Sequence, residues 1–127
     1  MGKELIIYGT GHSNVPVVDL IENLRKYKIS LLVDVRTLPR SRFSPQFNRD
    51  SLCSSLSQSG IDYLWFGDRL GGLGENRDYE GAIEWLAKLA KIKKVCVMCS
   101  EKDYLKCHRH TMIEPSLKEF NVSIVQI

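Results

Sequence analysis

The chain has 127 residues, a length that fits one globular domain spanning residues 1–127. Its 43% hydrophobic content is close to that of ordinary globular proteins, and the net charge of +3 does not by itself indicate nucleic-acid binding. No apolar run is long enough to span a membrane, and the apolar stretch at residues 5–8 is too short for a secretory signal. We therefore expect a cytoplasmic protein without a membrane partner, whose four cysteines are thiols, ligands or nucleophiles rather than disulfides.

Strand-like and helix-like segments alternate along the chain. We predict five strands, at residues 5–8, 31–35, 61–66, 95–98 and 122–127. Four helices are predicted between them. In chain order, these are a helix capped by Ser13 or Asn14, a helix from Asn48 or Asp50 to Gly60, a helix from Glu80 to Lys91, and a helix starting near Cys107 or His108. Leu52, Cys53 and Leu56 are expected on the buried face of the second helix, and residues 67–74 are expected to form a glycine-rich loop. Pro115 should kink the last helix or shift its start.

This alternation predicts an α/β protein with a mainly parallel sheet of about five strands, covered by helices on both faces in a Rossmann-like, three-layer arrangement. Ligands bind to such folds at the carboxyl ends of the strands. Three polar segments follow predicted strands, at residues 9–14, 34–42 and 99–109. We expect them to meet at one edge of the sheet as a composite site.

The first segment offers a histidine and a helix start. His12 can exchange a proton near neutral pH, so it is a candidate catalytic residue. Ser13 and Asn14 precede the helix, whose first amides can bind an anion. The structural alternative is a tight turn followed by a Ser or Asn cap.

The second segment gathers arginines beside an aspartate. Arg36, Arg40 and Arg42 are candidate ligand-binding residues, because guanidinium groups match phosphate and carboxylate geometry. Asp34 is a candidate base, or it orients one of these arginines. The structural alternative is a solvated loop that contains an Asp34–Arg36 ion pair.

The third segment contains Cys99, Glu101, Cys107, His108 and Arg109. Both cysteines are candidate nucleophiles, Glu101 is a candidate acid or base, and His108 and Arg109 are candidate ligand-binding residues. The two cysteines and the histidine are also potential zinc ligands. However, the gap between the cysteines lacks the short paired spacing of common structural zinc sites, and adjacent Cys and His ligands need an unusual local geometry. We therefore favour thiol or acid–base chemistry over zinc, and we expect no cofactor.

Several motifs together resemble the family catalogued as domain of unknown function 488. The matching motifs are Thr10–Asn14, Asp34–Arg36, Pro39–Ser41, Pro45–Phe47, Leu70–Gly72, Cys99–Glu101 and Cys107–Arg109. The resemblance implies a small cytoplasmic α/β protein, and the family has no established activity. This chain departs from the family pattern at Pro115, where the family helix usually continues with helix-forming residues.

Three functions remain open at this point. The first is an enzyme acting on a small anionic substrate, phosphate-bearing or nucleotide-like, at the carboxyl ends of the strands. The second is a nucleic-acid-binding module that uses the Arg36–Arg49 loop. The third is a metal-binding protein that uses Cys99, Cys107 and His108. The oligomeric state is left open.

Overall fold

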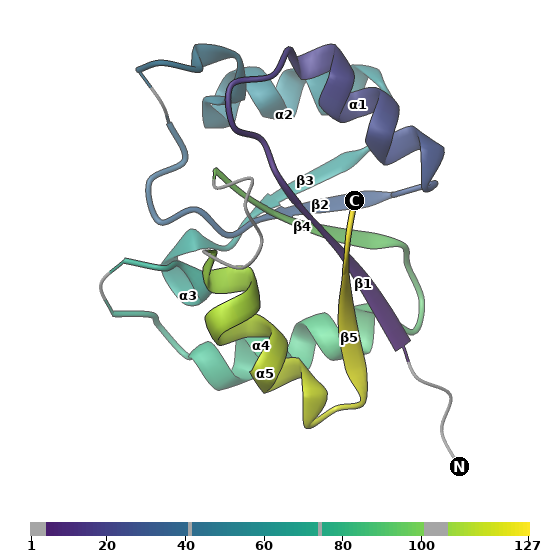
Figure 1. Cartoon of the computed structure of the whole chain (residues 1–127), viewed down its shortest axis with the longest axis vertical. Coiled ribbons are helices and arrows are strands. Elements are labelled where there is room, and N and C mark those ends of the chain that lie inside the picture. The colour runs from purple at the N-terminus through teal and green to yellow at the C-terminus, as the bar shows by residue number, and fades with distance from the viewer. Residues whose placement is uncertain (1–4, 41, 74, 101–106) are drawn as a thin grey trace.

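The computed structural model describes residues 5–40, 42–73, 75–100 and 107–127, with only the backbone of His110. Its centre is a sheet of five parallel strands in the order β3-β2-β4-β1-β5 (Figure 1). The strands are β1 (Leu5–Gly11), β2 (Leu31–Asp34), β3 (Asp62–Trp65), β4 (Val95–Cys99) and β5 (Val122–Gln126). The predicted α/β fold with a parallel sheet is confirmed.

Helices cover both faces of the sheet. The helices α1 (Val17–Lys26) and α2 (Arg49–Gln58) lie on one side, and α3 (Gly67–Leu70), α4 (Tyr79–Leu89) and α5 (Glu114–Lys118) lie on the other (Figure 1). Each layer of helices buries its own apolar core against the sheet. None of the helices in the described part of the chain is long and apolar enough to cross a bilayer.

The central strands are buried on both faces, so successive residues contribute to different cores. On β4, Cys96 and Met98 belong to the α1–α2 core, whereas Val97 and Cys99 belong to the α4–α5 core. The same alternation decides on which face of the sheet each side chain at the carboxyl edge lies.

The strand β1 is longer than the predicted strand at residues 5–8. Residues 9–11 continue to pair with β4, where Gly11 is opposite Cys99. Gly9 is needed at this point, because a Cβ there would lie 2.8 Å from the side chain of Ile124. The first helix also begins later than predicted, at Val17, because Pro16 is still extended, with φ of −61° and ψ of 144°, and no side chain caps the helix.

The prediction that Cys53 is buried was wrong. Cys53 is exposed, because Leu52 and Leu56 define the buried face of α2 and the next residue along a helix is rotated by about 100°. Residues 67–74, predicted as a loop, include the short helix α3.

The last helix has two parts. Residues 109–113 form a π-helical turn that continues directly into α5. Pro115 lies in the first turn of α5, directly after the π-helical turn, at a position where its missing N–H is tolerated. Single π-helical turns inside helices often occur at functional sites.

Gly67 allows the start of α3 to approach the chain after β2. A Cβ at this position would lie 1.8 Å from the Arg36 carbonyl oxygen. We expect Gly67→Ala to destabilise the protein by about 3 kcal/mol or more in urea denaturation, because the backbone must move. Gly60→Ala is the matched control. It has a φ of +77° and open space around it, so we expect only the conformational cost of about 1–2 kcal/mol. Equal losses in both variants would contradict this account.

Candidate functional site

A buried ion pair lies at the end of β2. Asp34 accepts hydrogen bonds from Arg36 at both carboxylate oxygens, from Nε at 2.8 Å and from Nη2 at 2.7 Å. Tyr63 donates its hydroxyl to the same carboxylate at 2.5 Å, and Nη2 of Arg36 also donates to the Phe47 carbonyl at 2.7 Å. Burial opposes the charge of Arg36, but the hydrogen bonds and negative charge of Asp34 outweigh it and raise the pKa of the guanidinium. The cluster joins β2, β3 and the Pro45–Phe47 turn.

His12 completes this cluster. Its Nδ1 lies 2.6 Å from the Ser13 carbonyl oxygen and its Nε2 lies 3.3 Å from Nη1 of Arg36. A carbonyl accepts and a guanidinium donates, so these partners assign a neutral ring with the proton on Nδ1. Burial, with the positive charge of Arg36, lowers the pKa of His12. The imidazole ring also stacks on the ring of Phe47, with 4.3 Å between the two ring centroids. Both nitrogens of His12 are therefore engaged in the fold.

The remaining candidate site residues of the first two segments are exposed. Ser13 and Asn14 lie on the surface, where the Asn14 side chain accepts a hydrogen bond from Ser44 at 2.8 Å. Arg40 and Arg42 are also exposed. These four side chains are not gathered around Asp34.

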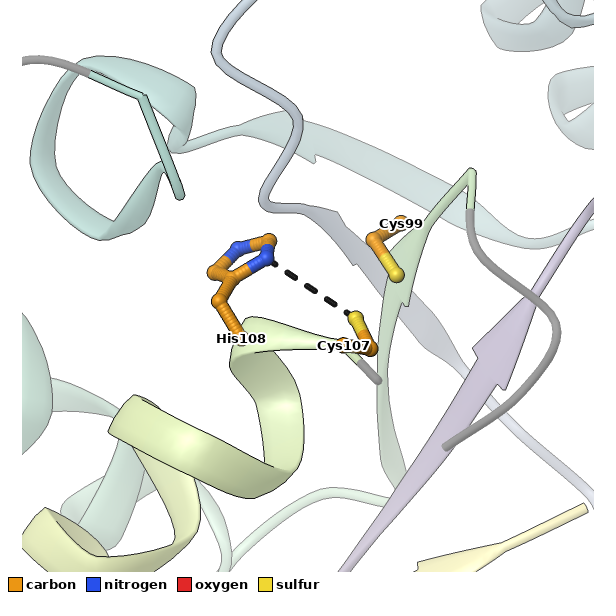
Figure 2. Close-up of side chains that lie close together, drawn as sticks. All are labelled: Cys99, Cys107 and His108. Carbon is orange, nitrogen blue, oxygen red and sulfur yellow. Dashed lines mark hydrogen bonds between the residues drawn. The ribbon is translucent and has the colours of Figure 1, made fainter. Parts of the chain in front are cut away.

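A second cluster, formed by Cys99, Cys107 and His108, lies on the opposite face of the sheet. The two sulfur atoms and one imidazole nitrogen all lie within 4.8 Å of one another. Figure 2 shows the three side chains turned toward a common space, with Cys99 at the end of β4 and the other two at the start of the last helical segment. The Sγ of Cys107 is 3.8 Å from Nδ1 of His108. The side chains of the adjacent residues Cys107 and His108 thus face the same space.

The orientation of His108 is fixed from its far side. Its Nε2 lies 3.2 Å from the carbonyl oxygen of Val35, which is an acceptor, so Nε2 carries the proton. In the neutral ring, Nδ1 then presents a lone pair toward Cys107. Gly72 leaves room for this nitrogen, since a Cβ at Gly72 would lie 2.9 Å from it.

Several donors converge on Cys107. Arg109 is fully buried and donates to its Sγ from the backbone nitrogen at 3.4 Å and from Nε at 3.2 Å. Gln126 of β5 holds the other end of the guanidinium by accepting from Nη1 at 2.5 Å. A hydrogen bond with Cys99, together with the donors of Arg109, lowers the pKa of the Cys107 thiol to about 3 against the opposing effect of burial. These hydrogen bonds favour the thiolate form of Cys107.

A pocket of about 460 Å³ opens beside this second cluster. Its lining includes Cys99, Cys107 and His108, together with the backbone or side chains of Arg36, Thr37, Leu38, Gly72, Leu73, Ser100 and Thr111. A separate hollow of about 420 Å³ lies beside α1, where Asp19, Glu22 and Lys26 mix both signs of charge. The predicted acid or base Glu101 lies outside the described residues.

The predicted site residues thus form two groups. His12, Asp34 and Arg36 meet on the α1–α2 face, and Cys99, Cys107, His108 and Arg109 meet on the α4–α5 face. The two groups touch through backbone atoms, as where the His12 amide donates to the Cys99 carbonyl at 3.0 Å. Sequence reasoning missed Tyr63 and Gln126, whose side chains complete the two clusters.

Fold and site together define a parallel α/β protein with a cysteine–histidine cluster at the carboxyl edge of its sheet. The chain belongs to the family described as Domain of unknown function DUF488, whose model matches residues 16–82. The matched region contains Asp34, Arg36 and Tyr63 and ends before the cysteine cluster. Neither a curated protein nor a solved structure matches the chain.

Tyr63→Phe tests the importance of the Asp34 cluster. We expect a loss of about 1.5 kcal/mol at neutral pH in urea denaturation, since a buried carboxylate loses a donor. Burial and the charge of Asp34 raise the pKa of Tyr63, so folded Tyr63 stays protonated where an unfolded tyrosine ionises. Stability contributed by a raised pKa is lost as pH rises. The free energy of unfolding of the wild type should therefore fall above about pH 10, and the stability difference between the wild type and Tyr63→Phe should narrow. A gap that widens there would count against this arrangement.

Proposed function

We propose that this protein is an enzyme acting on a small anionic substrate, and that Cys99, Cys107 and His108 hold a zinc ion at its reactive centre. The observation that carries the proposal is the convergence of three ligand atoms within 4.8 Å on the wall of a pocket. Two thiolates and one imidazole with a fourth position open is a ligand set of catalytic zinc.

The distances suit a tetrahedral ion. Zinc bonds to sulfur at about 2.3 Å and to nitrogen at about 2.0 Å, which places the two ligand atoms about 3.5 Å apart at the tetrahedral angle. The separation between Cys107 Sγ and His108 Nδ1 is 3.8 Å, close to this value, whereas separations of up to 4.8 Å within the cluster would have to shorten by about 1 Å on binding.

The surroundings of the ligands support the same assignment. Metal-bound histidines usually donate their second nitrogen to a carbonyl or carboxylate, as Nε2 of His108 does to Val35. The Arg109 donors to Cys107 stabilise a thiolate, the form of cysteine that binds metals. Both features are in place without an ion.

Charge favours an anionic substrate. A zinc ion with two thiolates is neutral, and the buried guanidinium of Arg109 leaves the centre with one net positive charge. The pocket lining also includes Ser100, whose hydroxyl can donate to an anionic oxygen. Zinc lowers the pKa of a bound water to about 7, so the open position would supply a nucleophile for attack on the substrate.

Metal analysis tests the zinc assignment directly. After incubation with zinc and desalting, we expect about one zinc per wild-type chain, because three ligands converge. Cys99→Ser and Cys107→Ser should lose it. Cys53→Ser is the matched control, since Cys53 is exposed on α2 and outside the cluster, and it should keep the metal. Equal zinc contents in Cys53→Ser and Cys107→Ser would contradict the site.

Cobalt substitution tests the open position and the anion together. Co²⁺ in the site should show thiolate charge-transfer bands and the visible spectrum of tetrahedral coordination. Adding inorganic phosphate should shift that spectrum, because the anion enters the open position. A spectrum that does not respond to phosphate would contradict anion binding at the metal.

A free nucleophilic thiolate is the competing role for Cys107, because the same donors would activate it. In that case iodoacetamide should modify Cys107 equally fast with and without zinc. Protection of Cys107 by zinc, measured by mass spectrometry, is the result that our proposal expects.

A further inference from the structure

Hydrogen bonds hold the loop between β2 and α2 against the rest of the protein and bring its two ends together. The Arg49 amide donates to the Pro39 carbonyl at 2.8 Å, and Gln46 donates from its side chain to the Val15 carbonyl at 2.9 Å. The buried guanidinium of Arg36 also holds the Phe47 carbonyl. These bonds bring the Pro39–Arg40 segment beside the start of α2.

The closed loop forms a second hollow next to the pocket. This hollow has a volume of about 520 Å³, and its lining includes Arg40, Asn48, Arg49 and Asp50. Leu38 lines both the hollow and the pocket beside His108, so the two spaces share a wall. A ligand longer than the pocket would extend over Leu38 into the hollow.

Cationic and apolar side chains are exposed together on this loop. Arg40, Arg42 and Arg49 are exposed, and Asp50 is the acidic residue among those lining the hollow. The guanidinium of Arg49 lies 5.0 Å from the centre of the Trp65 ring, which fixes its position. Phe43 is 86% exposed and Leu38 is 59% exposed.

We propose that this surface binds single-stranded nucleic acid, with phosphates on Arg40 and Arg49 and the adjoining nucleotide in the pocket beside His108. Arginine forks match phosphate oxygens, and exposed aromatic side chains stack unpaired bases. A duplex would bury its bases away from Phe43 and Leu38, so we assign the unpaired strand. The nucleotide in the pocket would be the small anionic group on which the proposed enzyme acts, and only this part of the inference rests on that function.

The test is binding of a fluorescent oligothymidylate, followed by anisotropy over a range of salt concentrations. Arg40→Gln/Arg49→Gln should bind at least about tenfold more weakly than the wild type at low salt. A plot of the logarithm of its binding constant against the logarithm of the salt concentration should have a slope shallower by about 1.4, since each phosphate contact to a single strand contributes about 0.7. Lys91→Gln/Lys93→Gln is the matched control, because it removes the same charge before β4, at the opposite edge of the sheet, and both lysines are exposed. This control should retain most of the affinity.

Three results would overturn the proposal. They are no salt-dependent binding by the wild type, equal losses in the arginine and lysine variants, or binding of the corresponding duplex as tight as that of the single strand. Zinc content separates this proposal from the previous one. The arginine variant should keep its zinc. The variant Cys107→Ser should lose its zinc but keep its salt-dependent affinity for the oligonucleotide.

Discussion

The buried ion pair between Asp34 and Arg36 is the interaction on which the carboxyl edge of the sheet depends. A buried charge is tolerated only with a partner and with its remaining hydrogen-bonding groups satisfied, and both conditions are met here. Asp34 receives donors from Arg36 and Tyr63, while Arg36 reaches His12 and the Phe47 carbonyl. Removing either charge would leave the other unpaired. The pair therefore ties the ends of β1, β2 and β3 to one geometry.

The parallel sheet separates this cluster from the cysteines. Leu32 and Asp34 share one face of β2, whereas Val33 belongs to the core on the other face, as does Cys99 of β4. The backbone between them carries the connection, since the residue after Asp34 provides the carbonyl that orients His108. In this arrangement, the Asp34 cluster positions the strand end and the cysteine cluster contains the reactive groups.

The fold was predictable because its signals are local. Apolar runs and amphipathic periods gave the five strands and most helices, and Gly60 marked the end of α2. Errors arose where packing decides. The extension of β1 depends on pairing with β4, and the burial of Cys53 depends on which stripe of α2 meets the sheet.

The candidate site was predictable in membership but not in arrangement. The polar segments after β1, β2 and β4 contain most of the clustered residues, as the topology requires. Tyr63 was missed because its role depends on the register of β3 against β2, where it pairs with Leu32, two residues before Asp34. The closeness of Cys107 and His108 to Cys99 depends on where the last helical segment starts relative to the end of β4, which a sequence pattern does not reveal.

The central place of β4 in the sheet has a consequence for how such a protein can diversify. Its two neighbours, β1 and β2, each send a connecting segment past the end of the cysteine-bearing strand. Connecting segments tolerate change far better than central strands do. Residues at these flanks can therefore be exchanged to suit different reactants while the sulfur-bearing strand between them stays unaltered.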